Sequence, residues 1–374
     1  MKKIAALVLT AVAFTLSHAP IVMAQTADIV IGQSVPLSGG NADFGKDIRA
    51  GAMAYFKQIN DEGGINGRPL KLVTLDDKND AKIAGENAKK LIEEERAVAL
   101  FGFASATLSL PAMPMVAEKR VPFFAPFTGA DTIRKQNDYV YTVRVTYAEE
   151  IEKLVNFWGS LGATRIAVLH YDDLVGKQNF ESVAAALRKF GKTPASIAIK
   201  RNAEVGDEVT NQVIAADPQM LLVTTLSAPA AKLISALQAK NKPYPVTSLS
   251  FVGVSQLAKA LGPQAAGITV ALTVPAPSNV QIPVVKECSH AWKDAGNSGA
   301  MSVTSLEACI AAKVLVEGIK RAGKSITRES LQTALSGLTR VDVGGFEVAF
   351  KPAFRHGGKF VDIAVIRLNG ELRS

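Results

Sequence analysis

Residues 28–45 read DIVIGQSVPLSGGNADFG, and the rest of the chain is organised around this stretch. Its apolar start, Ile29–Ile31, has the composition of a buried strand, and Ser38–Gly45 is a loop of small residues. A helical pattern follows from about Lys46 to Glu62. Ligands of open α/β sheets bind where a strand's carboxyl end turns into a helix, because backbone N–H groups collect there. We therefore expect this loop to form one wall of a binding site.

The same loop comes close to a nucleotide-binding motif but lacks one essential residue. Residues 40–46 fit G-x-x-x-x-G-K, but Asp47 follows where the motif needs a Ser or Thr hydroxyl for magnesium. A carboxylate at that point would face the phosphates. The loop therefore predicts a ligand other than a nucleotide.

Residues 1–24 have the pattern of a secretory signal peptide. Lys2 and Lys3 precede the apolar stretch Ile4–Leu16, which is too short to span a bilayer. Small side chains at Val22 and Ala24 predict cleavage before Gln25, with a second possible cut after Ala19. No cysteine lies near this cleavage site, so we expect no lipid anchor and a soluble periplasmic product.

Strand and helix patterns alternate along the remaining 350 residues (374 minus 24), a length that suggests two domains. The alternation runs to about residue 145 and then restarts, which predicts an α/β fold with two parallel sheets. Chain crossings are expected at 145–147 and 273–277. The predicted lobes are 28–145 plus 276–342, and 147–274 plus 344–374. A ligand would lie between them, since domain interfaces form natural clefts.

Charge and motifs argue against two function classes. The net charge of +8 falls to +6 when Lys2 and Lys3 leave (8 minus 2), and the basic residues are dispersed among acidic ones. We therefore expect no nucleic-acid binding. The chain has no G-x-S-x-G and no H-E-x-x-H motif, and His170, His290 and His356 are scattered. His170 with Asp172 and Asp173 is the one triad-like group. The sequence predicts neither catalysis, nor a metal site, nor a cofactor.

The mature chain has two cysteines, Cys288 and Cys309, in predicted helices 282–295 and 302–322. The oxidising periplasm permits a disulfide between them. Two buried thiols are the alternative, because cysteine is among the most buried residue types. The sequence leaves both open.

Several stretches resemble one protein family. They are PLSGGNADFG (36–45), INDEGGINGRPLKLVTLDD (59–77), FGFASATLSLPAMP (101–114), VPFFAPFTGADTIR (121–134) and SLEACIAAKVLVEGIKRAG (305–323). In order and spacing the chain is similar to the periplasmic leucine/isoleucine/valine-binding proteins, the branched-chain amino-acid receptors of ABC transporters. The resemblance implies two Rossmann-like lobes joined by three crossings, which close on a ligand.

The resemblance also implies a set of ligand-binding positions. In the first lobe they are Asn41, Phe44, Ser105, Ala106, Thr107, Thr128 and Gly129. Ser105–Thr107 would bind a carboxylate at a helix start without any Lys or Arg. In the second lobe Leu174, with Val175 after it, takes the place of a common aromatic residue. Ser250 and Phe251 fall near the position where relatives carry an acid for an ammonium group. That acid is missing, so both an amino acid and another small carboxylate stay open as ligands.

The resulting expectation is a non-enzymatic receptor that delivers a small solute to the membrane permease of an ABC importer. A secreted two-lobe α/β enzyme and a receptor for a membrane signalling protein are the alternatives. The absence of a nucleophile–base pair or metal set argues against the enzyme. Neighbouring permease and ATPase genes would separate transport from sensing.

Overall fold

The computed structural model describes residues 27–39, 41–134, 138–201, 203–351 and 355–374. The predicted signal peptide lies outside the described residues, as does Gly40 of the opening stretch. None of the described helices combines the length and the apolar composition needed to cross a membrane.

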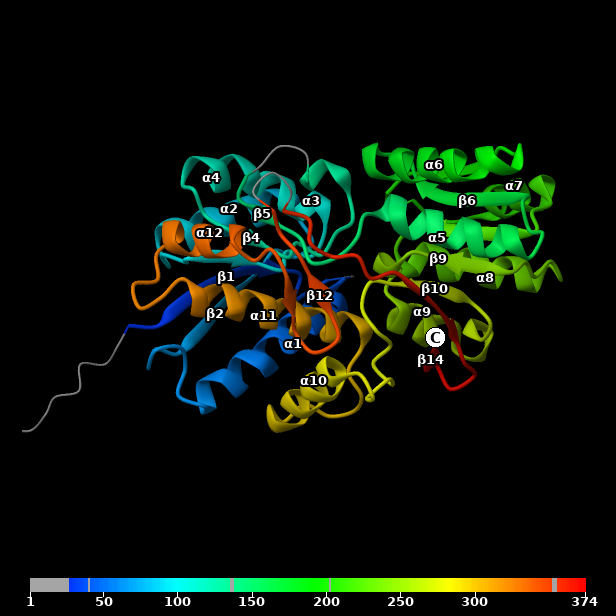
Figure 1. Cartoon of the computed structure of the whole chain (residues 1–374). Coiled ribbons are helices and arrows are strands. Elements are labelled where there is room, and N and C mark those ends of the chain that lie inside the picture. The colour runs from blue at the N-terminus through cyan, green and yellow to red at the C-terminus, as the bar shows by residue number, and fades with distance from the viewer. Residues whose placement is uncertain (1–26, 40, 135–137, 202, 352–354) are drawn as a thin grey trace, which may run out of the picture.

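Two α/β lobes lie side by side (Figure 1). In the described chain the first lobe has a parallel sheet with the order β2-β1-β3-β4-β5. Its strands are β1 (Ile29–Val35), β2 (Leu70–Asp76), β3 (Ala99–Phe101), β4 (Phe123–Phe124) and β5 (Val140–Tyr141). The helices that pack with it are α1 (Ala42–Asp61), α2 (Ala81–Glu93), α3 (Ala106–Ser109), α4 (Met113–Glu118), α10 (Pro283–Asp294), α11 (Val303–Arg321) and α12 (Arg328–Ser336).

The second lobe has a sheet with the order β14-β13-β10-β9-β8-β6-β7, in which β13 and β14 join antiparallel. Its strands are β6 (Ile166–Tyr171), β7 (Ala195–Ile199), β8 (Met220–Thr224), β9 (Val246–Ser248), β10 (Thr269–Leu272), β13 (Asp362–Ile366) and β14 (Leu372–Arg373). Its helices are α5 (Tyr147–Ser160), α6 (Leu174–Leu187), α7 (Asp207–Ala216), α8 (Ser227–Ala239) and α9 (Val254–Leu261). Short 3₁₀ turns are η1 (Leu110–Ala112), η2 (Asp131–Ile133), η3 (Arg188–Phe190), η4 (Ser250–Val252) and η5 (Gly262–Ala265). The predicted fold class, two-lobed α/β with parallel sheets, is confirmed.

Helix α1 begins at Ala42, four residues before the expected start at Lys46. The glycine in its first turn explains the difference. A Cβ on Gly45 would lie 1.9 Å from the carbonyl oxygen of Pro36, so the helix starts pressed against the chain that leaves β1. Only glycine permits so close an approach.

Helices α1, α10 and α11 cover one face of the first sheet with a continuous apolar core. Cys288 of α10 and Cys309 of α11 form a disulfide, with their Cα atoms 6.0 Å apart. A second core cluster runs from α2 and α4 to α5 and α6, and so joins the two lobes on the other face.

The chain passes between the lobes after β5, after β10, and a third time between the hairpin β11 (Val341–Asp342) and β12 (Glu347–Val348) and the strand β13. The predicted boundary lies at 342–344, and the apolar core of the first lobe includes described residues beyond it. Phe346, Val348 and Phe350 belong to the first lobe's core, and the Phe350 ring lies 5.2 Å from that of Tyr141. Burial of these apolar side chains keeps the hairpin on the first lobe. The red segment in Figure 1 then carries the chain to the second.

Candidate functional site

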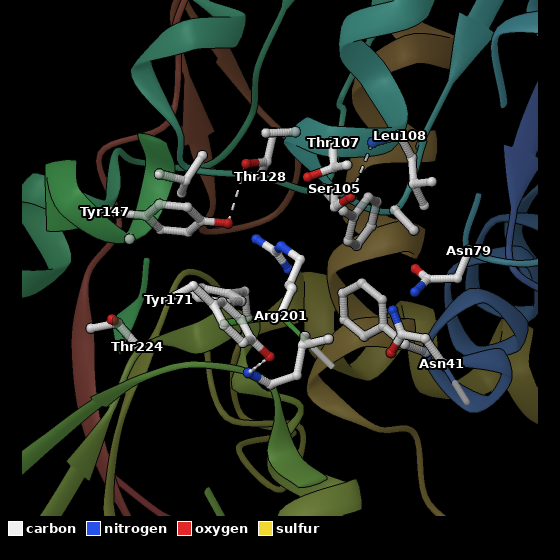
Figure 2. Close-up of a pocket in the computed structure, with 18 of the residues that line it drawn as sticks. Asn41, Asn79, Ser105, Thr107, Leu108, Thr128, Tyr147, Tyr171, Arg201 and Thr224 are labelled. Atoms are coloured by element: carbon white, nitrogen blue, oxygen red, sulfur yellow. Dashed lines mark hydrogen bonds between the residues drawn. The ribbon is translucent and has the colours of Figure 1, made fainter. Parts of the chain in front are cut away.

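A cavity of about 160 Å³ lies between the lobes at the carboxyl ends of strands from both sheets (Figure 2). The first lobe contributes Asn41, Phe44, Asn79, Phe127, Thr128 and the segment 104–108. The second lobe contributes chiefly Tyr147, Tyr171, Val175, Asn179, Arg201 and Phe251. Strand ends of both sheets therefore face one another across this cavity, as expected for a ligand site in an α/β protein.

Seven of the ten predicted site residues line the cavity. They are Asn41, Phe44, Ser105, Ala106, Thr107, Thr128 and Phe251. Asn41 precedes α1 without a side-chain capping hydrogen bond, so its amide is not used by the helix. Leu174, Gly129 and Ser250 are not among the lining residues, and each has a different structural reason.

Leu174 points away from the cavity. It is the first residue of α6, and the residue is 62% exposed. Val175 and Asn179, four residues apart and therefore on one helix face, line the cavity instead. Of Leu174 and Val175 at the predicted position, the rotation of the helix therefore brings Val175 to the cavity.

Gly129 positions an aromatic residue rather than facing a ligand. Its carbonyl accepts the Tyr147 N–H at 3.0 Å, and a Cβ there would lie 2.6 Å from the Tyr147 ring. The Tyr147 hydroxyl lies 3.2 Å from the Thr128 hydroxyl, a contact between the two lobes that Figure 2 draws as a dashed line. Gly129 therefore permits the Tyr147 ring to pack close to the first lobe.

Ser250 belongs to a buried polar network next to the cavity. Its N–H and hydroxyl donate to the two carboxylate oxygens of Glu150, at 2.8 and 2.9 Å. The Arg144 guanidinium donates to the Ser250 hydroxyl at 2.8 Å and pairs with Glu307 at 3.0 Å. The residue expected to face a ligand is therefore held by charged groups of the protein itself.

The short helix α3 leaves one hydroxyl facing the cavity. The Ser105 hydroxyl accepts the Leu108 N–H at 3.2 Å, so this side chain caps the helix. Thr107 lines the cavity, and within the described residues its hydroxyl has no recorded hydrogen-bond partner. Of the predicted Ser105–Thr107 group, Thr107 is therefore the side chain available to a ligand.

Two carboxylates brace the loop that follows β1. Asp76 accepts the Leu37 N–H at 2.8 Å and the Ser38 hydroxyl at 2.6 Å. Burial would raise the pKa of Asp76, but these hydrogen bonds lower it overall. Asp77 is buried between the Ser34 hydroxyl and the Asn79 N–H, and burial raises its pKa to about 6. Asp76 and Asp77 thus hold the end of β1 and the cavity residue Asn79 in place.

The cavity contains a cation that sequence reasoning missed. Arg201 follows β7, and its guanidinium stacks 4.2 Å from the Tyr171 ring centroid. Nε and Nη2 of Arg201 lie 2.8 and 2.7 Å from one oxygen of Asp173. The sequence placed no Lys or Arg at the predicted carboxylate site, whereas Arg201 lines the cavity that contains Ser105–Thr107. Tyr171 and Arg201 each end or follow a strand of the second sheet, and that position was the available signal.

Comparison with known proteins agrees with this architecture. The sequence profile of the periplasmic binding proteins matches residues 28–370. The chain belongs to the periplasmic binding protein family. The family resemblance predicted from the sequence is thereby confirmed.

Individual relatives show how far the likeness extends. An amino acid binding protein of Pseudomonas aeruginosa is 29% identical over 176 residues, which are 44% of this chain and 45% of that protein. The chain thus matches less than half the length of this curated relative. Among solved structures, a possible leucine/isoleucine/valine-binding protein of Rhodopirellula baltica has a TM-score of 0.89 and 26% identity, over 94% of this chain and 96% of that one. A substrate-binding periplasmic protein of Ralstonia solanacearum has a TM-score of 0.86 and 31% identity, over 92% and 99%.

The triad-like group of this periplasmic binding protein is not assembled as a triad. His170 Nε2 lies 2.7 Å from the Ser196 hydroxyl, but Nδ1 faces the backbone carbonyl of Tyr171 at 3.0 Å. A triad needs a carboxylate at Nδ1, whereas Asp172 pairs with Lys177 at 2.8 Å and Asp173 with Arg201. His170 and Ser196 are not among the residues that line the cavity. Within the described residues no group of His, Cys, Asp and Glu has the arrangement of a metal site.

Proposed function

We propose that this periplasmic binding protein is the solute receptor of an ABC importer, and that it closes its two lobes on a small amino acid or another small carboxylate. The observation that carries the proposal is the cavity itself, whose walls come from both lobes. A ligand that contacts both lobes favours the closed state by its differential affinity for that state.

Two further features support a binding role over catalysis. Among the described residues the His170–Ser196 pair has no carboxylate hydrogen-bonded to it, and neither residue lines the cavity. The relatives named above are binding proteins. Export by the signal peptide at residues 1–24 and capture of the closed form by a membrane permease belong to the same proposal.

The proposed first domain is residues 28–145 plus 276–342, extended through β12 to Phe350. The proposed second domain is residues 147–274 plus β13 and β14 of the segment 344–374. The β11–β12 hairpin and Phe350 move with the first domain, because their side chains are part of its core. The three crossings between the domains would act as the hinge.

A thermal-shift screen of the purified mature chain against amino acids and organic acids tests binding. For the ligand that raises Tm most, small-angle scattering should show a smaller radius of gyration with ligand than without it. A chain that binds no compound of either class, and does not contract, would contradict the proposal. Loss of uptake of that ligand after gene deletion would distinguish transport from sensing.

A further inference from the structure

The cavity has no carboxylate of its own to meet an ammonium group. None of the described residues that line it is Asp or Glu. Asp173 contacts the lining residue Arg201, and its carboxylate is already paired with that guanidinium. An α-amino acid would bring an ammonium group into this partly desolvated space, and a buried charge is costly unless it is paired.

The guanidinium of Arg201 is oriented to receive an anion. Its Nε and Nη2 atoms are occupied by Asp173, and the ring of Tyr171 fixes its plane. Nη1 has no recorded acceptor among the described residues, although guanidinium offers five N–H donors. In Figure 2 the guanidinium lies in the centre of the view, with Thr107 and Thr128 drawn on the side of the first lobe.

A neighbouring hollow adds positive charge. It shares Asn41, Asn79, Tyr171 and Leu226 with the cavity. Lys200 and Lys232 line it, opposed by Glu204, which lies 3.8 Å from Lys232. Together with Asp173, which pairs with Arg201, the cavity and the hollow have three cations, Lys200, Lys232 and Arg201, and two carboxylates, Glu204 and Asp173. This excess of one positive charge favours an anion near the mouth of the cavity.

The walls and the size of the cavity fit one aromatic ring. Phe44 and Phe127 meet edge to face with centroids 6.4 Å apart, and Tyr147 and Phe251 lie 4.7 Å apart. Tyr171 adds a fifth aromatic side chain. Aromatic faces and edges accept another ring in stacked or edge-to-face geometry. The volume is about 160 Å³, and an apolar cavity of about 150 Å³ binds benzene.

Asn179 supplies an independent sign of a ligand. Asn179 is 3% exposed and lines the cavity. Its side-chain Nδ2 atom has no hydrogen-bond partner in the described part of the chain. A buried donor without an acceptor is unfavourable, so native proteins rarely leave one. An oxygen atom of the ligand would satisfy it.

We propose that the cleft binds a small aromatic carboxylate without an α-ammonium group, with the carboxylate at Arg201, the ring between the aromatic walls, and a further oxygen at Asn179. This assignment rests on the proposed function, because it names the solute class of the same site. Thr107 faces the carboxylate from the first lobe. The anion therefore contacts both lobes when they close.

Calorimetry on the mature chain tests the assignment with five probes: benzoate, 4-hydroxybenzoate, L-phenylalanine, L-leucine and benzamide. We expect the two aromatic carboxylates to bind at least tenfold more tightly than the other three. L-Phenylalanine isolates the effect of the ammonium group, and benzamide isolates the effect of the charge. Tighter binding of either amino acid would overturn the assignment and leave the proposed receptor function intact. No binding of any probe would also overturn it, and the broad screen above would then decide on the receptor function alone.

Two variants test the residues. Arg201→Gln should weaken benzoate binding at least tenfold and change benzamide binding less than twofold. Asn179→Leu should weaken the binding of both ligands, and the loss of affinity should be about fivefold larger for 4-hydroxybenzoate than for benzoate. Arg165→Gln is the matched control, because Arg165 forms an exposed ion pair with Asp217 in the same lobe and is not among the lining residues. Equal benzoate affinity in Arg201→Gln and Arg165→Gln, with unchanged Tm, would show that Arg201 does not bind the carboxylate.

Discussion

Thr107 and Thr128 contribute the same hydroxyl group to the cavity, but their surroundings differ. Thr128 is buried, and its hydroxyl accepts the Ala130 N–H at 3.1 Å and meets the Tyr147 hydroxyl. Thr107 is exposed to the cavity without a recorded partner in the described chain. A hydroxyl already paired within the protein supports the fold, whereas an unpaired one is available to a ligand. We therefore expect Thr128 to contribute to the stability of the fold and Thr107 to contribute to ligand affinity.

We predict that Thr107→Val lowers ligand affinity by about 1–3 kcal/mol, because a hydrogen bond to a charged carboxylate is lost. The Tm of the free protein should stay unchanged. Thr128→Val should instead lower Tm, since it leaves the Ala130 N–H and the Tyr147 hydroxyl without their partner. Calorimetry with the best ligand and thermal unfolding without ligand measure the two effects. Unchanged affinity in both variants would exclude a carboxylate site on the first lobe.

The buried carboxyl of Asp77 predicts a pH dependence. Its pKa is raised to about 6 from 3.8, so the folded state takes up a proton between these pH values. Its contribution to stability is therefore complete below about pH 4 and is lost as the pH rises through 6. At about 1.4 kcal/mol per pKa unit, the loss at pH 7 is up to about 3 kcal/mol.

Asp77→Asn should remove this loss, because the amide keeps an acceptor for Asn79 N–H and a donor for Ser34. We expect the variant to be more stable than the natural chain by about 1–3 kcal/mol at pH 7 and equal to it near pH 4. Urea unfolding at pH 4, 5, 6 and 7 measures the difference, with exposed Asp294→Asn as the control. A difference that does not change with pH would contradict the raised pKa.

At the scale of elements, the first lobe depends on close contact between helices. A Cβ on Gly51 of α1 would lie 2.0 Å from the Ser305 carbonyl of α11, so these helices touch through their backbones. Helix α10 packs beside both and is joined to α11 by the Cys288–Cys309 disulfide. The bridge closes a loop with a sequence separation of 21 residues. It therefore fastens the segment that returns from the second lobe to the first lobe's core.

We predict no titratable thiol in the unfolded, unreduced protein and two after reduction. In the chain-entropy account, a loop of this length stabilises the fold by about 3 kcal/mol. Cys288→Ala/Cys309→Ala should lose about that amount in urea unfolding, and reductant should then have no further effect on it. Two titratable thiols before reduction would exclude the bridge.

At the scale of the whole molecule, a buried charged network connects the crossings. Arg144 lies between β5 and α5, Thr273 follows β10, Glu307 is in α11 of the first lobe, and Glu150 is in α5 of the second. Burial raises the pKa of both glutamates. Burial would lower the pKa of Arg144, but Glu307 and Glu150 raise it overall. One guanidinium thus holds groups of both lobes next to two of the chain crossings, where the proposed closure would bend the chain.

We predict that Arg144→Met destabilises the protein by about 3–5 kcal/mol, because it leaves buried carboxylates without their cation. The loss of stability should grow as the pH rises above 4.5, the ordinary pKa of a glutamate side chain. Because the pKa values of Glu150 and Glu307 are raised, these side chains can stay neutral at low pH and need the cation less there. Urea unfolding at pH 4.5 and 7 measures this. Lys57→Met, which breaks the exposed Lys57–Asp61 pair, should change stability by less than about 1 kcal/mol. Equal losses in the two variants would contradict a buried network.

The sequence alone determined the fold class, the order of strands and helices, and most of the first-lobe wall of the cavity. The fold class and the order of elements follow from local patterns, namely apolar strands and helical periodicity. The first-lobe wall follows from the small-residue loop at 38–45 together with the positions that the family resemblance implies. Asp80, for example, caps α2 by accepting the N–H groups of Lys82 and Ile83, and Asp is among the preferred residues at this position. Such features depend on neighbours along the chain and can be recognised without the tertiary structure.

Only the tertiary structure decided which residues form the second-lobe wall of the cavity. Whether Leu174 or Val175 faces the cavity depends on the rotation of α6 on its sheet. Ser250 is unavailable to a ligand because Arg144, 106 residues earlier in the chain, binds it. Arg201 enters the cavity because Tyr171 and Asp173, from the neighbouring strand end, hold its guanidinium. Each outcome is set by contacts between residues far apart in sequence, which no local pattern encodes.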